Sequence, residues 1–241
     1  MKGKNAMQKE HTLTSNDYFQ RIIIFIALVV LVLIVQIPLS FIMMGKLSTI
    51  GSLAMSGGYI LGFVIAIWIA VSVYRHYVHP IKKVINGHDI QMILVAYGAF
   101  FVIQIALNLL NQVLYHQTST ANNQVIYQIM GQNHLTLILM GITAVFCSPI
   151  LEELVFRGFL IGSMFTRRSR IAAIIVSGIL FSFPHMEDVN VISFLTYAIL
   201  GGTLAYLYVK TENIKVPIGL HFLNNLIAMS MMLVQVLIHT H

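Results

Sequence analysis

The sequence predicts an all-helical, polytopic membrane protein, and three observations lead to this fold class. Of the 241 residues, 58% are hydrophobic and only 9% are charged, whereas soluble domains carry roughly 25% charged residues. Apolar runs near the roughly 20 residues that a helix needs to cross the hydrocarbon core fill most of the chain. Basic residues are scattered among short loops, so the formal net charge of +6 does not predict a nucleic-acid-binding face.

About seven apolar segments can be marked between polar breakers. They cover residues 22–44, 53–74, 90–115, 135–165, 171–183, 191–209 and 216–238. The fourth segment is long enough to project past the bilayer, whereas the fifth is short. The first has too long an apolar run for a signal peptide, and no small-residue cleavage site follows it. We therefore expect one integral membrane domain of seven spans.

Basic residues predict the orientation of these spans, because short loops rich in Lys and Arg stay on the cytoplasmic side. The amino-terminal tail and the second, fourth and sixth loops carry them, whereas the alternate loops hold only Lys46. This alternation predicts a cytoplasmic amino terminus and an outer carboxy terminus. The basic residues concerned are Lys2, Lys4, Lys9, Arg21, Arg75, Lys82, Lys83, Arg167, Arg168, Arg170, Lys210 and Lys215.

Two adjacent carboxylates and a guanidinium interrupt the fourth segment, at Glu152, Glu153 and Arg157. Carboxylates are costly in hydrocarbon, so a functional site is the default interpretation. Residues four apart share a helix face, so Glu153 can pair with Arg157 while Glu152 points about 100 degrees away. Pro149 lies just ahead and is expected to loosen the helix and free backbone carbonyls. A structural ion pair at the cytoplasmic helix end is the alternative.

Two later segments add polar groups at helical spacing. His185 closes the fifth segment, and Phe181 lies four residues earlier, where its ring can brace the imidazole. His221 and Asn225 share one face of the seventh helix, about one and a half turns beyond Lys215. We expect both to meet a water-filled cavity that opens toward the cytosolic end. An interhelical hydrogen bond is the alternative.

These motifs together resemble the CAAX prenyl protease and bacteriocin-processing (CPBP) family, also called the abortive-infection family. The motifs are Glu-Glu-x-x-x-Arg at 152–157, Phe-x-x-x-His at 181–185 and His-x-x-x-Asn at 221–225, in that order on successive membrane helices. The resemblance covers the chain from about residue 141 onward. It implies an intramembrane protease with a catalytic core over 134–241. From charge and hydropathy, we expect a cytoplasmic tail over 1–21 and three helices with their loops over 22–133 ahead of this core.

The resemblance also implies a role for each motif residue. Glu152 and His185 would activate a water molecule, while His221 and Asn225 would stabilise the tetrahedral oxyanion. The residue types fit these roles, because desolvation makes a carboxylate a stronger base. An imidazole and a side-chain amide can both donate hydrogen bonds to a negative oxygen. The remaining motif residues would support the site: Glu153, Arg157 and Phe181.

The metal requirement of such a site is left open by the sequence. Glu152, His185 and His221 would supply a carboxylate and two imidazoles, which suits a catalytic zinc ion with an open position for water. The chain has no His-Glu-x-x-His element and no cysteine cluster. We expect a metal-free glutamate mechanism without a cofactor, with zinc as the alternative.

The substrate is the least constrained feature. The eukaryotic branch of the family cuts prenylated tails, but a short chain rich in Ile and Lys indicates a bacterial plasma membrane protein. The resemblance then implies processing of membrane-associated peptides, such as bacteriocin or signalling precursors, or bacteriocin self-immunity. The expected partners are such a peptide and the lipid bilayer, without nucleic acid, and the oligomeric state is not predicted. A non-catalytic scaffold or immunity protein is the alternative; a transporter is disfavoured because no inverted repeat is visible.

Overall fold

A computed structural model describes residues 13–239, and every regular element in this range is a helix. The amino-terminal tail predicted for residues 1–21 therefore lies mostly outside the described residues, together with Lys2, Lys4 and Lys9. The elements are α1 (Ser15–Ile34), α2 (Ile37–Met43), α3 (Thr49–Val78), α4 (Gly87–Tyr115), α5 (Ala121–Gln132), α6 (His134–Ile142), η1 (Thr143–Cys147), α7 (Ser148–Glu153), η2 (Leu154–Ile161), α8 (Gly162–Met164), η3 (Arg167–Ser169), α9 (Arg170–Ser182), η4 (Phe183–His185), α10 (Val191–Thr211) and α11 (Lys215–His239).

Six helices in the described residues are long and apolar enough to cross a membrane. They span Ser15–Met43, Thr49–Val78, Gly87–Tyr115, His134–Met164, Val191–Thr211 and Lys215–Ile238. They coincide with six of the seven predicted segments, which confirms a polytopic, all-helical membrane protein. The predicted fifth segment forms α9, whose 13 residues extend about 20 Å. This is shorter than the roughly 30 Å of a hydrocarbon core.

Local sequence signals set the helix boundaries. Thr14 caps α1 in a capping box with Asp17, and Asn86 caps α4 in the same way with Asp89. Such caps satisfy backbone N–H groups that have no partner inside the helix. Helix α10 ends at Glu212, whose backbone has the left-handed conformation with φ of 51°. The helices therefore begin and end where polar residues interrupt the apolar runs.

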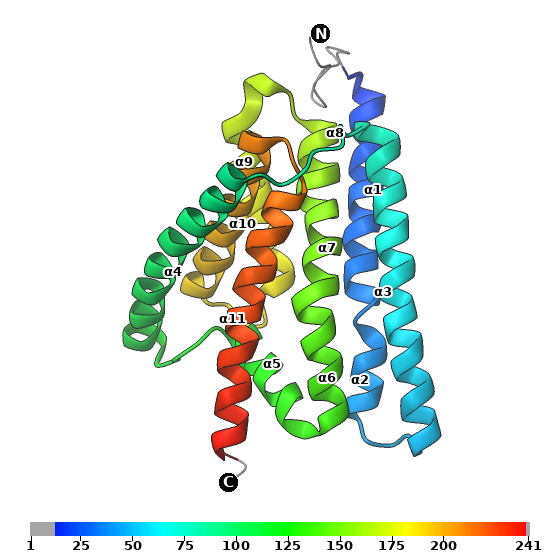
Figure 1. The fold of residues 1–241 in the computed structure, drawn as a ribbon, viewed down its shortest axis with the longest axis vertical. Coiled ribbons are helices and arrows are strands. Elements are labelled where there is room, and N and C mark those ends of the chain that lie inside the picture. The colour runs from blue at the N-terminus through cyan, green and yellow to red at the C-terminus, as the bar shows by residue number, and fades with distance from the viewer. Residues whose placement is uncertain (1–12, 240–241) are drawn as a thin grey trace.

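The basic loops gather at one end of the helix bundle. The Lys83 ammonium donates a hydrogen bond to the Thr211 carbonyl oxygen over 2.7 Å. The Arg167 guanidinium pairs with the Glu212 carboxylate at 2.8 Å. These contacts join the second, fourth and sixth loops at the end where α1 begins, whereas α11 ends at the opposite end (Figure 1).

Helices α9 and α10 cross with their backbones in contact, and two glycines make this approach necessary. A Cβ atom on Gly178 would lie 2.7 Å from the Ala198 carbonyl oxygen. A Cβ atom on Gly201 would lie 3.0 Å from the Gly178 Cα atom and from the Phe181 side chain. Real Cβ atoms essentially never show the first distance, and the second is tighter than most Cβ contacts. The crossing holds Phe181, and thus the end of α9, beside η2 and α10.

Candidate active site

The helix that carries the two glutamates changes its backbone register on both sides of them. The π-helices η1 and η2 flank α7, which contains Pro149, Glu152 and Glu153. In the π register, the Ser148 N–H donates to the Thr143 carbonyl, five residues earlier. The next carbonyl, that of Ala144, would pair with residue 149 in this register, but proline has no N–H. Short π-helical stretches are common at functional sites.

The carbonyl group freed in this way has a partner from another helix. The Asn225 amide Nδ2 donates to the Ala144 carbonyl oxygen over 2.8 Å. Its Oδ1 accepts from the Asn224 amide over 3.1 Å. The loosening of the helix expected from Pro149 is therefore present. The freed Ala144 carbonyl group holds Asn225 of α11 against the helix that carries the glutamates.

The predicted pair of Glu153 and Arg157 is present and is completely buried, with both side chains 0% exposed. The Arg157 guanidinium donates to Glu153 Oε1 and to the Gly201 carbonyl oxygen, each over 2.8 Å. It also lies 4.4 Å from the Phe181 ring centroid, in cation–π contact. A buried charge needs such partners. The α9–α10 crossing supplies two of them, because it brings Phe181 and Gly201 to this point.

Glu153 has a second partner, which the sequence did not predict. The His221 Nδ1 atom lies 2.9 Å from Glu153 Oε1. A carboxylate only accepts hydrogen bonds, so Nδ1 carries the proton and donates it. The arrangement fixes the orientation of the His221 ring and directs its Nε2 atom toward Glu152.

Glu152 faces both histidines. Its Oε2 atom lies 3.9 Å from His185 Nε2 and 4.0 Å from His221 Nε2. This oxygen is buried and has no hydrogen-bond partner among the described residues. The His185 Nδ1 atom lies 2.9 Å from the Phe181 carbonyl oxygen, which can only accept, so neutral His185 presents an Nε2 lone pair. One carboxylate oxygen and two imidazole nitrogens thus converge on one region.

Two aromatic rings hold the His185 imidazole. The Phe181 centroid lies 4.7 Å away and the Tyr197 centroid 4.6 Å away, the latter stacked with an interplanar angle of 22°. The bracing by Phe181 agrees with the spacing of the two residues in the sequence. Tyr197 was not predicted, because an aromatic residue inside an apolar segment carries no distinguishing signal.

A cavity of about 410 Å³ lies in front of these residues, and Glu152, His185, His221 and Asn225 all line it. It continues between α1, α2, α5, α6 and α11 as far as Met43 and Met232. These residues lie toward the end opposite the basic loops. The cavity therefore extends away from the basic end, whereas a cavity that opens toward that end was expected. Buried aromatic side chains fill that side instead: Phe156, Phe159 and Phe181.

The fit of the site to a metal ion can be judged from its donor atoms. In the described residues, no group of three His, Cys, Asp or Glu side chains has the geometry to hold a metal ion. Of the atoms considered for zinc, the Nε2 atoms of His185 and His221 lie 3.9 and 4.0 Å from Glu152 Oε2. Both Nδ1 atoms are hydrogen-bonded, an arrangement that serves either a metal ligand or a general base.

Comparisons with known proteins agree with this geometry. Residues 134–227 match the family described as "Rce1-like: Type II CAAX prenyl endopeptidase Rce1-like". The chain is also 28% identical over 145 residues to the candidate membrane peptidase YdiL of Bacillus subtilis (strain 168). That match covers 58% of this chain and 57% of the relative, so the chain spans little more than half of the relative's length.

No solved structure matches the chain. The family match begins at the start of α6 and includes all three motifs, at 152–157, 181–185 and 221–225. The segment from α6 to the middle of α11 is therefore similar to the Rce1-like type II CAAX prenyl endopeptidases.

Proposed function

We propose that the protein is an intramembrane endopeptidase that hydrolyses a peptide bond in a membrane-associated peptide or protein. One observation carries the proposal. Glu152 Oε2 stands about 4 Å from the Nε2 atoms of His185 and His221 at the wall of the cavity. A carboxylate in this position, without a permanent partner, is costly to keep inside a membrane protein unless it acts on something that enters the cavity.

The chemistry follows from the hydrogen-bond pattern. A water molecule between Glu152 and His185 would give a proton to the carboxylate as its oxygen attacks the carbonyl carbon of the substrate. The His185 Nε2 lone pair would accept the second hydrogen of this water and orient it. When the C–N bond breaks, Glu152 would return its proton to the departing amine. The second proton of the water would pass through His185 Nε2 to the departing amine, so the products are a carboxylate and an ammonium group.

The oxyanion would form on the side of His221 and Asn225. Because the His221 Nδ1 proton is committed to Glu153, His221 must carry a second proton on Nε2 to donate to the oxyanion. The Asn225 Nδ2 group donates one of its two hydrogens to the Ala144 carbonyl oxygen, and the second hydrogen would serve the oxyanion.

The arrangement of the loops supports a topology of seven crossings with a cytoplasmic amino terminus. Lys83, Arg167 and Glu212 meet at one end of the bundle, and the positive-inside rule puts that end in the cytoplasm. Helix α9, with η4, would make the fifth crossing only in part. The proposed location is a bacterial plasma membrane, as expected for a chain similar to a Bacillus subtilis protein. The proposed mechanism uses no metal ion.

The proposed activity can be tested in cells that carry wild type, Glu152→Gln, Glu212→Gln or a deletion. New protein termini and accumulated precursors are compared in their membranes by mass spectrometry, with immunoblots to confirm equal accumulation. Glu212 lies at the basic end, remote from the cavity lining, so its variant is a matched control. We expect Glu152→Gln to match the deletion and the control to match wild type. If Glu152→Gln matches wild type, a non-catalytic scaffold or immunity protein replaces the proposal.

A further inference from the structure

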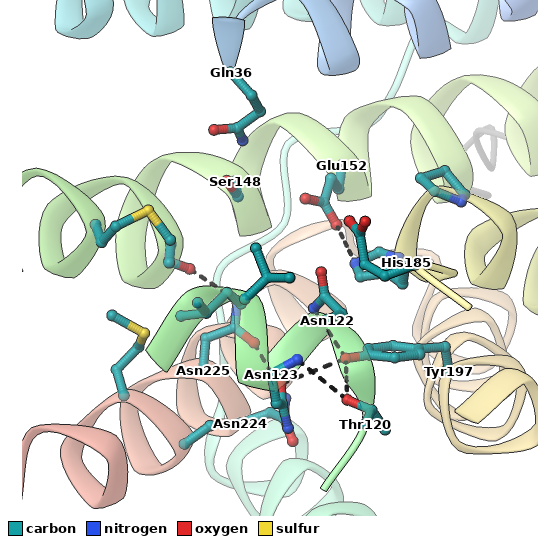
Figure 2. A pocket seen from close by; sticks show the side chains of 18 of the residues that line it. Gln36, Thr120, Asn122, Asn123, Ser148, Glu152, His185, Tyr197, Asn224 and Asn225 are labelled. Carbon is teal, nitrogen blue, oxygen red and sulfur yellow. Dashed lines mark hydrogen bonds and ion pairs between the residues drawn. The ribbon is translucent and has the colours of Figure 1, made fainter. Parts of the chain in front are cut away.

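Helix α5 places an amide opposite the proposed catalytic pair. Asn122 lies on the cavity wall, between Tyr197 on one side and Glu152 with His185 on the other (Figure 2). Its Nδ2 atom donates to the Tyr197 hydroxyl over 3.0 Å. Its Oδ1 atom points toward the gap in front of Glu152 and His185 (Figure 2). An acceptor therefore faces the place where a scissile peptide would lie.

The hydrogen bonds of Tyr197 fix this arrangement. The hydroxyl group also contacts Thr120 Oγ1 at 3.0 Å and donates to Asn123 Oδ1 over 3.4 Å. Because the Tyr197 ring stacks on His185, the start of α5 and the histidine are held in one rigid cluster. The Asn122 amide is thus oriented by the protein before any ligand binds.

Other uncharged amides line the same cavity. Asn224 donates through Nδ2 to Asn225, which leaves its Oδ1 atom as an acceptor. Gln36 accepts the Tyr59 hydroxyl through Oε1 over 2.8 Å, which leaves its Nε2 atom as a donor. An extended peptide backbone presents both N–H and C=O groups, so a wall that carries acceptors and a donor complements it.

The cavity lacks the charge that a substrate carboxylate would need. Among the described residues, no Lys or Arg lines it, and its acidic members are Glu152 and Glu187. A carboxylate that enters such a cavity loses its hydration without meeting a Lys or Arg side chain, and it lies near the like charge of Glu152 and Glu187. The remaining lining is largely apolar, with methionines at 43, 140, 229 and 232, and methionine adapts to varied apolar partners.

We propose that Asn122, Asn224 and Gln36 form a subsite that binds the backbone of an extended, uncharged and largely apolar peptide segment. The bond cut is then internal to the substrate, and a free carboxyl terminus stays outside the cavity. This inference rests on the proposed function for the cut itself, whereas the binding of the segment can be measured separately.

The test uses the full chain carrying Glu152→Gln in detergent micelles, so that binding is measured without turnover. The probe is a dodecapeptide of Ala, Val, Leu, Asn and Gly with a central photoreactive benzoylphenylalanine and an amidated carboxyl end. A second probe has the same sequence but ends in a free carboxylate three residues after the photoreactive group. The saturable crosslinked fraction gives the affinity, and mass spectrometry gives the crosslinked positions.

We expect the amidated probe to crosslink to cavity residues of α5 and α11, and the free-carboxylate probe to bind at least about tenfold more weakly. Asn122→Ala should weaken binding of the amidated probe about three- to tenfold, the loss that one hydrogen bond predicts. Gln124→Ala is the matched control, because Gln124 is an exposed residue of α5 outside the cavity lining. Tyr197→Phe removes the tyrosine hydroxyl but keeps the amide, so it should weaken binding less than Asn122→Ala.

Three results would overturn the subsite. They are equal or tighter binding of the free-carboxylate probe, no difference between the Asn122 and Gln124 variants, and no saturable crosslinking in the cavity. A loss as large for Tyr197→Phe as for Asn122→Ala would assign the effect to the cluster rather than to the amide, and would also contradict it. Amide-dependent binding without cleavage in cells would instead refute the proposed hydrolase while leaving the peptide subsite intact.

Discussion

The crossing of α9 and α10 offers a sharp test of how the site is held in place, because two adjacent glycines differ in their surroundings. A Cβ atom on Gly201 would lie 3.0 Å from the Gly178 Cα atom and from the Phe181 Cβ and Cδ1 atoms. The nearest atom to a Cβ on Gly202 is the Ile174 Cγ2 atom, at 3.9 Å. Alanine at the first position would therefore require Gly178 or Phe181 of α9 to move by a few tenths of an ångström, whereas alanine at the second would make ordinary contact.

The expected magnitude can be worked out from these contacts. Both substitutions gain about 1 kcal/mol of helix propensity, which cancels when the two variants are compared. Overpacking at Gly201 costs about 1 to 3 kcal/mol. For a protein of this size each kcal/mol shifts the thermal midpoint by about 2 to 4 °C. Gly201→Ala should therefore unfold at a temperature about 2 to 12 °C below that of Gly202→Ala.

The midpoints can be measured as the recovery of monodisperse protein by size-exclusion chromatography after heating in detergent. Gly201→Ala should also lower peptide cleavage, because the clash moves Phe181, which contacts both His185 and Arg157. Equal midpoints for the two variants would refute the argument that backbone contact at this crossing positions the site. A higher midpoint for Gly201→Ala would refute it as well.

Three further predictions concern the buried ion pair, a surface ion pair and the metal requirement. Arg157→Met should lower the free energy of unfolding by about 3 to 5 kcal/mol, because it leaves a buried Glu153 carboxylate without its cation; Arg157→Met with Glu153→Gln should accumulate better than the single variant on immunoblots. Glu212→Gln removes the partner of Arg167 and Arg170 and should change the free energy of unfolding by less than about 1 kcal/mol in thermal unfolding at low salt. Exhaustive treatment with a chelator should leave peptide cleavage intact, and recovery of a lost activity by added zinc would contradict the metal-free mechanism.

Much of the fold could be predicted because the bilayer imposes a simple length rule. Six apolar segments became long helices, five of them within four residues of the predicted bounds, whereas the first begins seven residues earlier than predicted. The fifth differs, because α9 ends after 13 residues where Phe183, Pro184 and His185 form a 3-10 turn. The length rule does not apply there, since α9 packs closely against α10 and need not satisfy the bilayer alone.

Local spacing predicted part of the site and missed the rest. The pair of Glu153 with Arg157 and the bracing of His185 by Phe181 follow from the helical repeat of residues four apart. The bond between His221 and Glu153 joins residues 68 positions apart, and no local pattern indicates it. The roles of these residues in catalysis stay predictions until they are tested by substitution.

The contribution of α5 had no signal in the sequence. The segment between α4 and α6 is polar and nearly uncharged, which is typical of a connecting loop. It forms a wall of the cavity, where Thr120 and Asn122 are hydrogen-bonded to the Tyr197 hydroxyl. These contacts join residues far apart in sequence. The direction in which the cavity extends had no signal in the sequence either. The position of His221 near Lys215 gives its depth but not which side the large aromatic residues fill.

The two adjacent glutamates show how helix geometry divides one motif into two environments. A rotation of about 100 degrees per residue turns Glu153 toward Arg157 and His221, where its Oε1 atom receives two hydrogen bonds. The same rotation turns Glu152 toward the cavity, where its Oε2 atom receives none from the described residues. The first carboxylate joins α7 to η2 and α11 through hydrogen bonds, whereas the second makes none through its Oε2 atom among the described residues. Its retention inside an apolar helix is therefore explained by what enters the cavity rather than by the fold.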